Sequence, residues 1–168
     1  PSEKEVEVEN AVEKTEDIDA DIFEYRSTER KWQKSKLWTE RYTEARTFLY
    51  GTKKVERNLE VAYSLLKREA QSGNPLAMYD LGKMWKNGLC QNADLEKAEL
   101  WYKKAFECFL QLEKTEEKNT YIHYRLGKML AAGEGTERDY VMAAHWLDKA
   151  SLKHHKYAEY TLAGLYYK

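Results

Sequence analysis

Apolar residues recur at the spacing of an α-helix along most of this chain. The stretches 81–88 (LGKMWKNG) and 98–105 (AELWYKKA) both place apolar or small residues at i, i+3, i+4 and i+7. These residues are Leu81, Met84, Trp85 and Gly88 in the first stretch and Ala98, Trp101, Tyr102 and Ala105 in the second. One apolar face at this spacing is typical of an amphipathic helix. The pattern therefore predicts two successive helices.

Both helices are written twice. LGKMWKNG at 81–88 returns as LGKMLAAG at 126–133, and AELWYKKAF at 98–106 returns as AAHWLDKAS at 143–151, each displaced by 45 residues. Internal repeats with a period of about 20 to 50 residues are typical of stacked supersecondary units. Because a catalytic site usually occurs once in a chain, the repetition favours a structural building block over an active site.

Weaker copies flank this pair. AYSLLKREA at 62–70 precedes AELWYKKAF by 36 residues, and AEYTLAGLYYK at 158–168 is a first helix whose second helix is missing. We expect about three and a half hairpins, in units 36–73, 74–118, 119–154 and a partial 155–168. The residues predicted to pack these hairpins together are Leu81, Gly82, Trp85, Ala98, Trp101, Ala105, Leu126, Gly127, Ala143, Trp146, Ala150 and Leu162.

Polar and glycine residues mark the ends of the predicted helices. Asn74 followed by proline is a typical helix start, and Asn92 or Asp94, and Asp139, open the second helices. Glycine is favoured just after a helix, where the backbone becomes left-handed. On this basis Gly88 and the Gly133–Gly135 pair end the first helices.

The glycine after leucine in each first helix has a packing role. Gly82 and Gly127 occupy equivalent places, which Ala45 and Ala163 occupy in the outer units. A glycine inside a helix costs about 1 kcal/mol relative to alanine, so its reuse needs a cause. We expect close approach of the partner helix, with the small residues Ala98 and Ala143 opposite and tryptophan filling the space between units.

The repeats are spaced by 36 residues in one case and by 45 in the other, and the longer spacing predicts a longer second helix. The nine additional residues of the 45-residue spacing fall in FECFLQLEKTEEKNT at 106–120. Its apolar residues continue the second helix, which they lengthen by about 13 Å at 1.5 Å per residue.

The pattern of residues 75–105 resembles a known repeat family. AMYDLGKMWKNG followed by DLEKAELWYKKA is similar to the Sel-one-like repeat, a hairpin of the tetratricopeptide type, and the resemblance covers roughly residues 38–168. It implies an all-α fold, a right-handed α-solenoid of antiparallel helix hairpins, which acts as a scaffold for protein partners. Cys90 stands where the family has a second glycine, so we expect a looser turn there.

A second resemblance concerns the parent protein. RTFLYG at 46–51, the stretch 59–84 and HKYAEYTLAGLYYK at 155–168 are similar to the region after the nuclease domain in mobilisation relaxases of Gram-positive conjugative elements. This resemblance implies that the chain accompanies a DNA-nicking enzyme. It carries over no catalytic residue. Because the chain starts with Pro1 and ends inside a unit, we expect it to be a fragment of a longer bacterial protein.

Charge divides the chain into two parts. Residues 1–24 hold ten acidic residues against two lysines, a net charge of −8, which leaves +7 for residues 25–168. The acidic stretch has no dense apolar face and is predicted to be a disordered linker. The helical-repeat domain is accordingly predicted to span 25–168.

The two cysteines, Cys90 and Cys108, lack a C-x-x-C partner, which argues for a reducing compartment and against a disulfide framework or zinc site. We expect a cytoplasmic protein. No apolar run reaches about 18 residues, and the start does not resemble a signal peptide. No membrane partner is predicted.

The sequence gives little support for a catalytic site or a metal site. No H-E-x-x-H, phosphate-binding or dinucleotide-binding motif occurs. Cys108 is interpreted as a core residue, and no cofactor, metal or catalytic residue is predicted. The histidines, interpreted as packing or surface residues, are His123, His145, His154 and His155.

The remaining candidate is a surface formed by the first helices. In solenoids these line the concave side, where a protein or peptide, or another domain of the parent protein, is expected to bind. The candidate partner-binding residues recur from unit to unit in three rows: Tyr79, Tyr124 and Tyr160; Asp80 and Arg125; Lys83 and Lys128. Tyrosine suits binding because it buries a large area and keeps a polar group, and packing between repeats is the alternative. The rival function is nucleic-acid binding through the basic body, although no basic stripe is visible.

Overall fold

The computed structural model describes residues 36–115, 119–151 and 163–165. The chain forms two compact units, Pro1–Trp38 and Thr39–Lys168. The predicted linker 1–24 lies outside the described residues, and its boundary stays a prediction. The helices of the second unit are α2 (Glu40–Tyr50), α3 (Leu59–Gln71), α4 (Pro75–Asn87), α5 (Leu95–Thr115), α6 (Thr120–Ala132) and α7 (Tyr140–Ser151).

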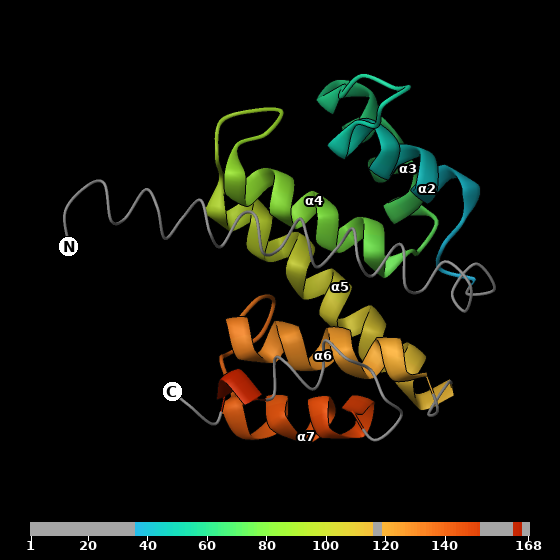
Figure 1. The fold of residues 1–168 in the computed structure, drawn as a ribbon. Helices are drawn as coiled ribbons and strands as arrows, with labels where there is room; N and C mark the ends of the chain where they lie inside the picture. Colours follow the sequence, from blue (N-terminus) through green and yellow to red (C-terminus); the bar gives the residue numbers. More distant parts are fainter. Residues whose placement is uncertain (1–35, 116–118, 152–162, 166–168) are drawn as a thin grey trace. The chain divides into compact units, whose positions relative to one another are not determined.

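These helices pair as consecutive hairpins. α2 packs on α3, α4 on α5 and α6 on α7, while α3 contacts α4 and α5 contacts α6 to join one hairpin to the next. Figure 1 shows α4 and α5 running in opposite directions, as do α6 and α7. The predicted all-α stack of helix hairpins is confirmed. Among the described residues, no helix combines the length and the apolar character that a bilayer crossing requires.

The helix ends follow the predicted signals. The Asn74 side chain accepts a hydrogen bond from the Leu76 backbone N–H at 3.0 Å, with proline in the first turn of α4. Gly88 and Gly133 end α4 and α6 in the left-handed conformation, at φ 60° and 69°. Of the two candidate starts of α5, Asp94 is the cap. Its carboxylate accepts from the Lys97 N–H at 3.0 Å, and this bond holds the pKa of Asp94 below its ordinary value.

The predicted lengthening of the second helix is also present. α5 has 21 residues, whereas its counterpart α3 has 13. The added turns are packed, because Phe109 is fully buried.

Close approach at the two helical glycines is confirmed, but the expected partners are only partly right. A Cβ on Gly82 would lie 2.6 Å from the Tyr102 ring, and one on Gly127 would lie 2.6 Å from Cγ of Leu147. Large side chains, rather than the predicted alanines, press against the glycines; Ala143 contributes its backbone carbonyl, 3.1 Å from the same point. The predicted alanines lie one turn earlier on the same helices. A glycine gives room to a large partner as well as to a small one, so its position alone did not identify the residue opposite it.

The other predicted packing residues lie mostly in the interior. Leu81, Ala98, Ala105, Leu126, Ala143 and Ala150 are buried. Trp85, on α4, meets Tyr63 of α3 edge-on at 6.2 Å and so does fill space between units. Trp101 and Trp146 are half-buried under the ammonium groups of lysines one turn later. Leu162 lies outside the described residues.

The turn after α4 has Cys90 where the turn after α6 has Gly135, and the two turns also differ in how closely their backbones approach the preceding unit. A Cβ on Gly135 would collide with the backbone of α5 at Tyr102 and Lys103. At the equivalent place Cys90 fits its side chain, with Sγ 3.7 Å from the Leu59 carbonyl of α3. The α4–α5 turn therefore has room for a side chain beside the preceding unit, and the looser turn expected at Cys90 stays a prediction.

Candidate partner-binding surface

Side-chain contacts between units place α2, α4 and α6 next to one another. The Tyr42 hydroxyl of α2 donates to Asp80 of α4 at 2.8 Å. The Arg125 guanidinium of α6 lies 4.2 Å from the centre of the Tyr79 ring of α4. We call the surface formed by α2, α4 and α6 the first-helix face.

The tyrosine row runs along the buried side of these helices. Tyr79 and Tyr124 are 2% and 3% exposed, and Tyr42, at the equivalent place in α2, is 1% exposed. Tyr160 lies outside the described residues. Tyr79 packs on Tyr102 of its own hairpin, with ring centroids 5.2 Å apart. The structure thus favours the packing alternative for this row, to which Tyr42 belongs although the sequence analysis missed it.

Burial raises the pKa values of two phenols in this row, those of Tyr42 and Tyr79. Burial raises the pKa of Tyr42 well above its ordinary value; the Arg46 guanidinium opposes that shift and the Asp80 carboxylate reinforces it. Burial likewise raises the pKa of Tyr79, and the Glu134 carboxylate adds to the shift. The two hydroxyls are therefore hydrogen-bond donors over the physiological range.

The Asp80 and Arg125 row also lies inside the fold rather than on its surface. Asp80 is 2% exposed and accepts from Tyr42 and from Arg46 Nη1, the latter at 3.4 Å. Arg125 is 3% exposed and stacks on three aromatic rings, of which Tyr79 is nearest. Because each charge has its counterpart on a neighbouring helix, both residues join units to one another. The structure therefore corrects the expectation that Asp80 and Arg125 are exposed to a partner.

The lysine row is the part of the prediction that stays accessible. Lys83 of α4 and Lys128 of α6 are both half-exposed at equivalent places. Arg46 holds the corresponding place in α2 but is 8% exposed. Among the described residues of the three rows, Lys83 and Lys128 are therefore the ones that remain partly exposed.

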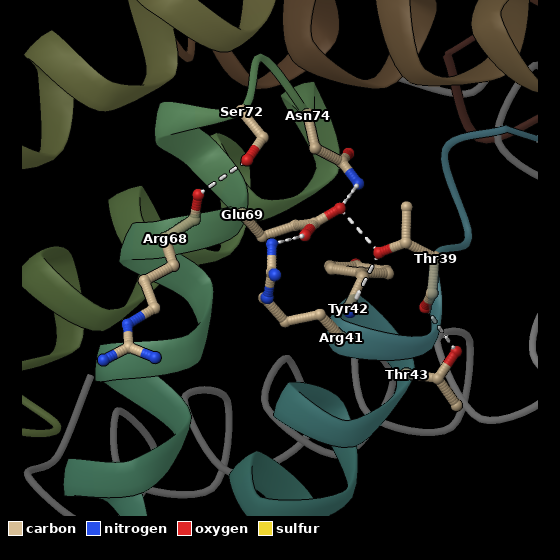
Figure 2. Close-up of polar contacts among 8 residues, drawn as sticks. All are labelled: Thr39, Arg41, Tyr42, Thr43, Arg68, Glu69, Ser72 and Asn74. Atoms are coloured by element: carbon tan, nitrogen blue, oxygen red, sulfur yellow. Dashed lines mark hydrogen bonds and ion pairs between the residues drawn. The ribbon is translucent and has the colours of Figure 1, made fainter.

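A buried carboxylate at the edge of this face ties three helices together (Figure 2). Glu69, near the end of α3, is 3% exposed. Its Oε1 accepts from the Thr39 hydroxyl at 2.6 Å and from the Asn74 amide at 3.0 Å, while Arg41 Nη1 lies 3.4 Å from Oε2. Thr39 and Asn74 cap α2 and α4. Sequence reasoning missed Glu69, because glutamate in a helix is normally solvated and its partners lie in other helices.

The histidines and cysteines that were tested for chemistry have structural surroundings. Cys108, interpreted from the sequence as a core residue, is only half-buried on α5. His123 is 3% exposed, stacks on Trp146 at 5.4 Å and has Nε2 3.4 Å from Glu113. His145 is exposed beside the same tryptophan, and His154 and His155 lie outside the described residues. Burial raises the pKa of the Cys108 thiol, which lowers its thiolate fraction and its reactivity. Within the described ranges, no cluster of three potential metal ligands occurs.

Comparison with known proteins identifies the repeat. The Sel1 repeat model matches residues 45–74, 75–108 and 123–155. A comparison with curated proteins gave no match.

Two solved structures are similar to this one. One is c5321, a protective antigen of uropathogenic Escherichia coli strains with an SLR fold, with 27% identity, a TM-score of 0.52 and coverage of 76% of this chain and 25% of that one. The other, a Sel1 repeat protein from Oxalobacter formigenes, has 21% identity, a TM-score of 0.50 and coverage of 73% and 46%. The chain thus spans less than half the length of either protein.

Proposed function

Because this chain belongs to the Sel1 repeat family, whose members are helical-repeat scaffolds, we propose that it is a non-catalytic scaffold that binds a protein segment on its first-helix face. The observation that carries the proposal is the contact of α2, α4 and α6 through Tyr42, Asp80, Tyr79 and Arg125. These contacts link the first helices of three successive hairpins, and in solenoids the first helices line the concave side, where an extended segment can bind.

The same contacts supply rigidity. Buried charge pairs and stacked rings hold neighbouring first helices, so that a partner meets a surface that is already ordered. Preorganisation of this kind raises affinity because less conformational freedom is lost on binding.

A photo-crosslinking experiment tests the location. A photoreactive amino acid replaces Lys86, which is half-exposed on α4, or Glu99, which is exposed on α5. Peptides are first selected on the immobilised chain from a random library without regard to charge. We expect crosslinks from position 86 and few from position 99. Equal crosslinking at the two positions, or a library that yields no peptide, would contradict the proposal.

The parent protein is the second part of the proposal. We propose that the chain is an accessory region of a larger bacterial protein, for which the resemblance of 46–51, 59–84 and 155–168 suggests a mobilisation relaxase. The coding sequence upstream of Pro1 tests this. A relaxase nuclease domain with its histidine cluster is expected there, and an unrelated domain would refute the origin.

Nucleic-acid binding remains the alternative, on the strength of the +7 body. Against it, Arg46 and Arg125 are buried and engaged within the fold. DNA affinity that falls steeply as salt rises would favour this alternative, whereas no binding at low salt would leave the protein partner.

A further inference from the structure

We propose that His123 and Glu113 form a pH-sensitive switch, in which a protonated imidazole holds the end of α5 on the third hairpin and a neutral imidazole holds it less tightly. The inference goes beyond the proposed scaffold function and does not depend on it. The observation that carries it is the place of His123, where side chains of α5, α6 and α7 meet.

His123 is a buried imidazole that contacts two neighbouring helices. It lies near the start of α6 and is 3% exposed. Its Nε2 is 3.4 Å from Oε1 of Glu113, near the end of α5, whose side chain is 18% exposed. Its ring stacks on Trp146 of α7, with the centroids 5.4 Å apart and the planes inclined by 28°. One titratable side chain therefore joins the end of α5 to α7.

The strength of both contacts depends on the charge of the imidazole. Histidine is the side chain whose ordinary pKa allows a change of charge between pH 5 and 8. An imidazolium attracts the Glu113 carboxylate through a charge-assisted hydrogen bond and the Trp146 ring through a cation–π contact. A neutral imidazole has one N–H donor, and a separation of 3.4 Å is long for a hydrogen bond. Loss of the proton therefore weakens the connection.

Other charged groups near His123 act on the same proton equilibrium. The Lys149 ammonium lies 4.6 Å from the centre of the Trp146 ring and repels a cation that stacks on that ring. His145 meets the ring edge-on at 5.5 Å and is exposed. Three more charged residues connect α5 to α6 outside the described ranges, Glu116, Glu117 and Lys118. The experiment has to separate Glu113 from these groups.

The histidine and the glutamate belong to this unit alone, whereas the tryptophan beside them recurs. Trp101 of α5 and Trp146 of α7 stand 45 residues apart, each with a lysine ammonium over its ring. In α4 the place of His123 is held by Met78, which binds no proton. Glu113 lies in the part of α5 by which that helix exceeds α3. The titratable contact thus occurs where the second helix is lengthened.

An NMR titration of the imidazole Cε1–H signals between pH 5 and 8 tests the proposal on the full chain. Comparison with His123→Gln identifies the His123 signal, and its contact with the Trp146 ring identifies it independently. Because a nearby opposite charge favours the charged form, Glu113→Gln should lower the midpoint of the His123 titration by about one pH unit. That shift is about a tenfold loss of proton affinity.

Matched controls locate the effect. Glu107→Gln removes the same charge at an exposed position of α5 and should leave the His123 midpoint in place. The double variant E116Q/E117Q should move it less than Glu113→Gln does. The His145 signal, from a histidine beside the same tryptophan, should not respond to Glu113→Gln.

A double-mutant cycle measures the connection itself. Urea unfolding of His123→Gln, Glu113→Gln and the double variant is followed on the acid and the alkaline side of the His123 midpoint. Because the ion pair exists only while the imidazole is protonated, the coupling should be about tenfold in the unfolding equilibrium constant on the acid side. It should fall to about twofold or less on the alkaline side. Circular dichroism checks that each variant is folded.

Four results would overturn the inference. The first is a His123 signal that does not titrate between pH 5 and 8. The second is a midpoint that Glu113→Gln leaves unchanged. The third is an equal shift in Glu107→Gln or E116Q/E117Q, which would attribute the effect to the general charge of this region. The fourth is a coupling of equal size on both sides of the midpoint, which would describe a contact that does not respond to the proton.

Discussion

Replacing Gly82 by alanine separates helix propensity from packing, since the two effects have opposite signs. In an open helix the change stabilises by about 1 kcal/mol. At Gly82 the new Cβ would lie 2.6 Å from Cδ1 and Cε1 of the Tyr102 ring. That ring is 3% exposed and packs against Tyr79, so it has little room to yield. Overpacking costs about 1–3 kcal/mol, and we expect a net loss of stability of about 1 kcal/mol.

The assay is urea unfolding followed by far-UV circular dichroism, with the free energy of unfolding compared between Gly82→Ala and the original chain. The decisive comparison uses a Tyr102→Ala background. There the ring is gone, and Gly82→Ala should raise the free energy of unfolding by about 1 kcal/mol.

A control substitution lies at Gly164, where no heavy atom of the described residues is within 4 Å of an added Cβ. Gly164→Ala should not reduce stability. If Gly82→Ala destabilises the chain equally with and without the Tyr102 ring, the close-approach explanation of the repeated glycine is wrong.

Three further predictions concern the buried polar groups. Glu69→Ala should lower the free energy of unfolding by about 3 kcal/mol in urea titrations, because hydrogen bonds to charged groups are strong and the Thr39 hydroxyl loses its acceptor; a loss below about 1 kcal/mol would contradict the role of Glu69. Arg125→Met should cost about 2 kcal/mol through the lost cation–π stacking, whereas Arg125→Lys should cost less, and equal losses would argue against stacking. Burial raises the pKa values of Tyr42 and Tyr79 above the ordinary 10.0, so just above that pH these two phenols ionise in the unfolded chain but not in the folded one. Their contribution to stability should be constant below pH 10 and fall above it by about 1.4 kcal/mol per pH unit for each tyrosine. Tyr42→Phe should reduce that slope, and an unchanged slope would show that this phenol does not cause it.

Local sequence signals predicted the framework well. Asn74 and Gly88 act within one helical turn, through a side chain or backbone that serves its own neighbours, so their roles follow from the sequence alone. The periodic apolar face of α5 likewise predicted its extension into 106–120, and the helix ends at Thr115. Such features depend on residues a few positions apart.

Contacts between units were not predictable in the same way. Asp80 was expected on the surface, and its burial depends on Tyr42 and Arg46, which lie more than 30 residues earlier. The identity of the group opposite Gly82 also depends on the rotation of α5 about its axis, which the spacing of small residues does not determine. Glycine at 82 correctly indicated close approach, but the expected residue opposite it, Ala98, was wrong, because Tyr102 fills the space.

The repeated and the unrepeated residues of this stack have different tasks. Glycine and alanine recur in unit after unit, and the glycines let the two helices of each hairpin approach closely. Asp80 and Arg125 occupy one and the same position of the repeat and carry opposite charges, each matched to its own neighbour, Arg46 in one case and the aromatic rings around Tyr79 in the other. A hairpin moved one place along the stack would set Arg125 against Arg46, and two buried cations in contact are strongly destabilising. The buried polar contacts therefore fix the order of the units in the stack.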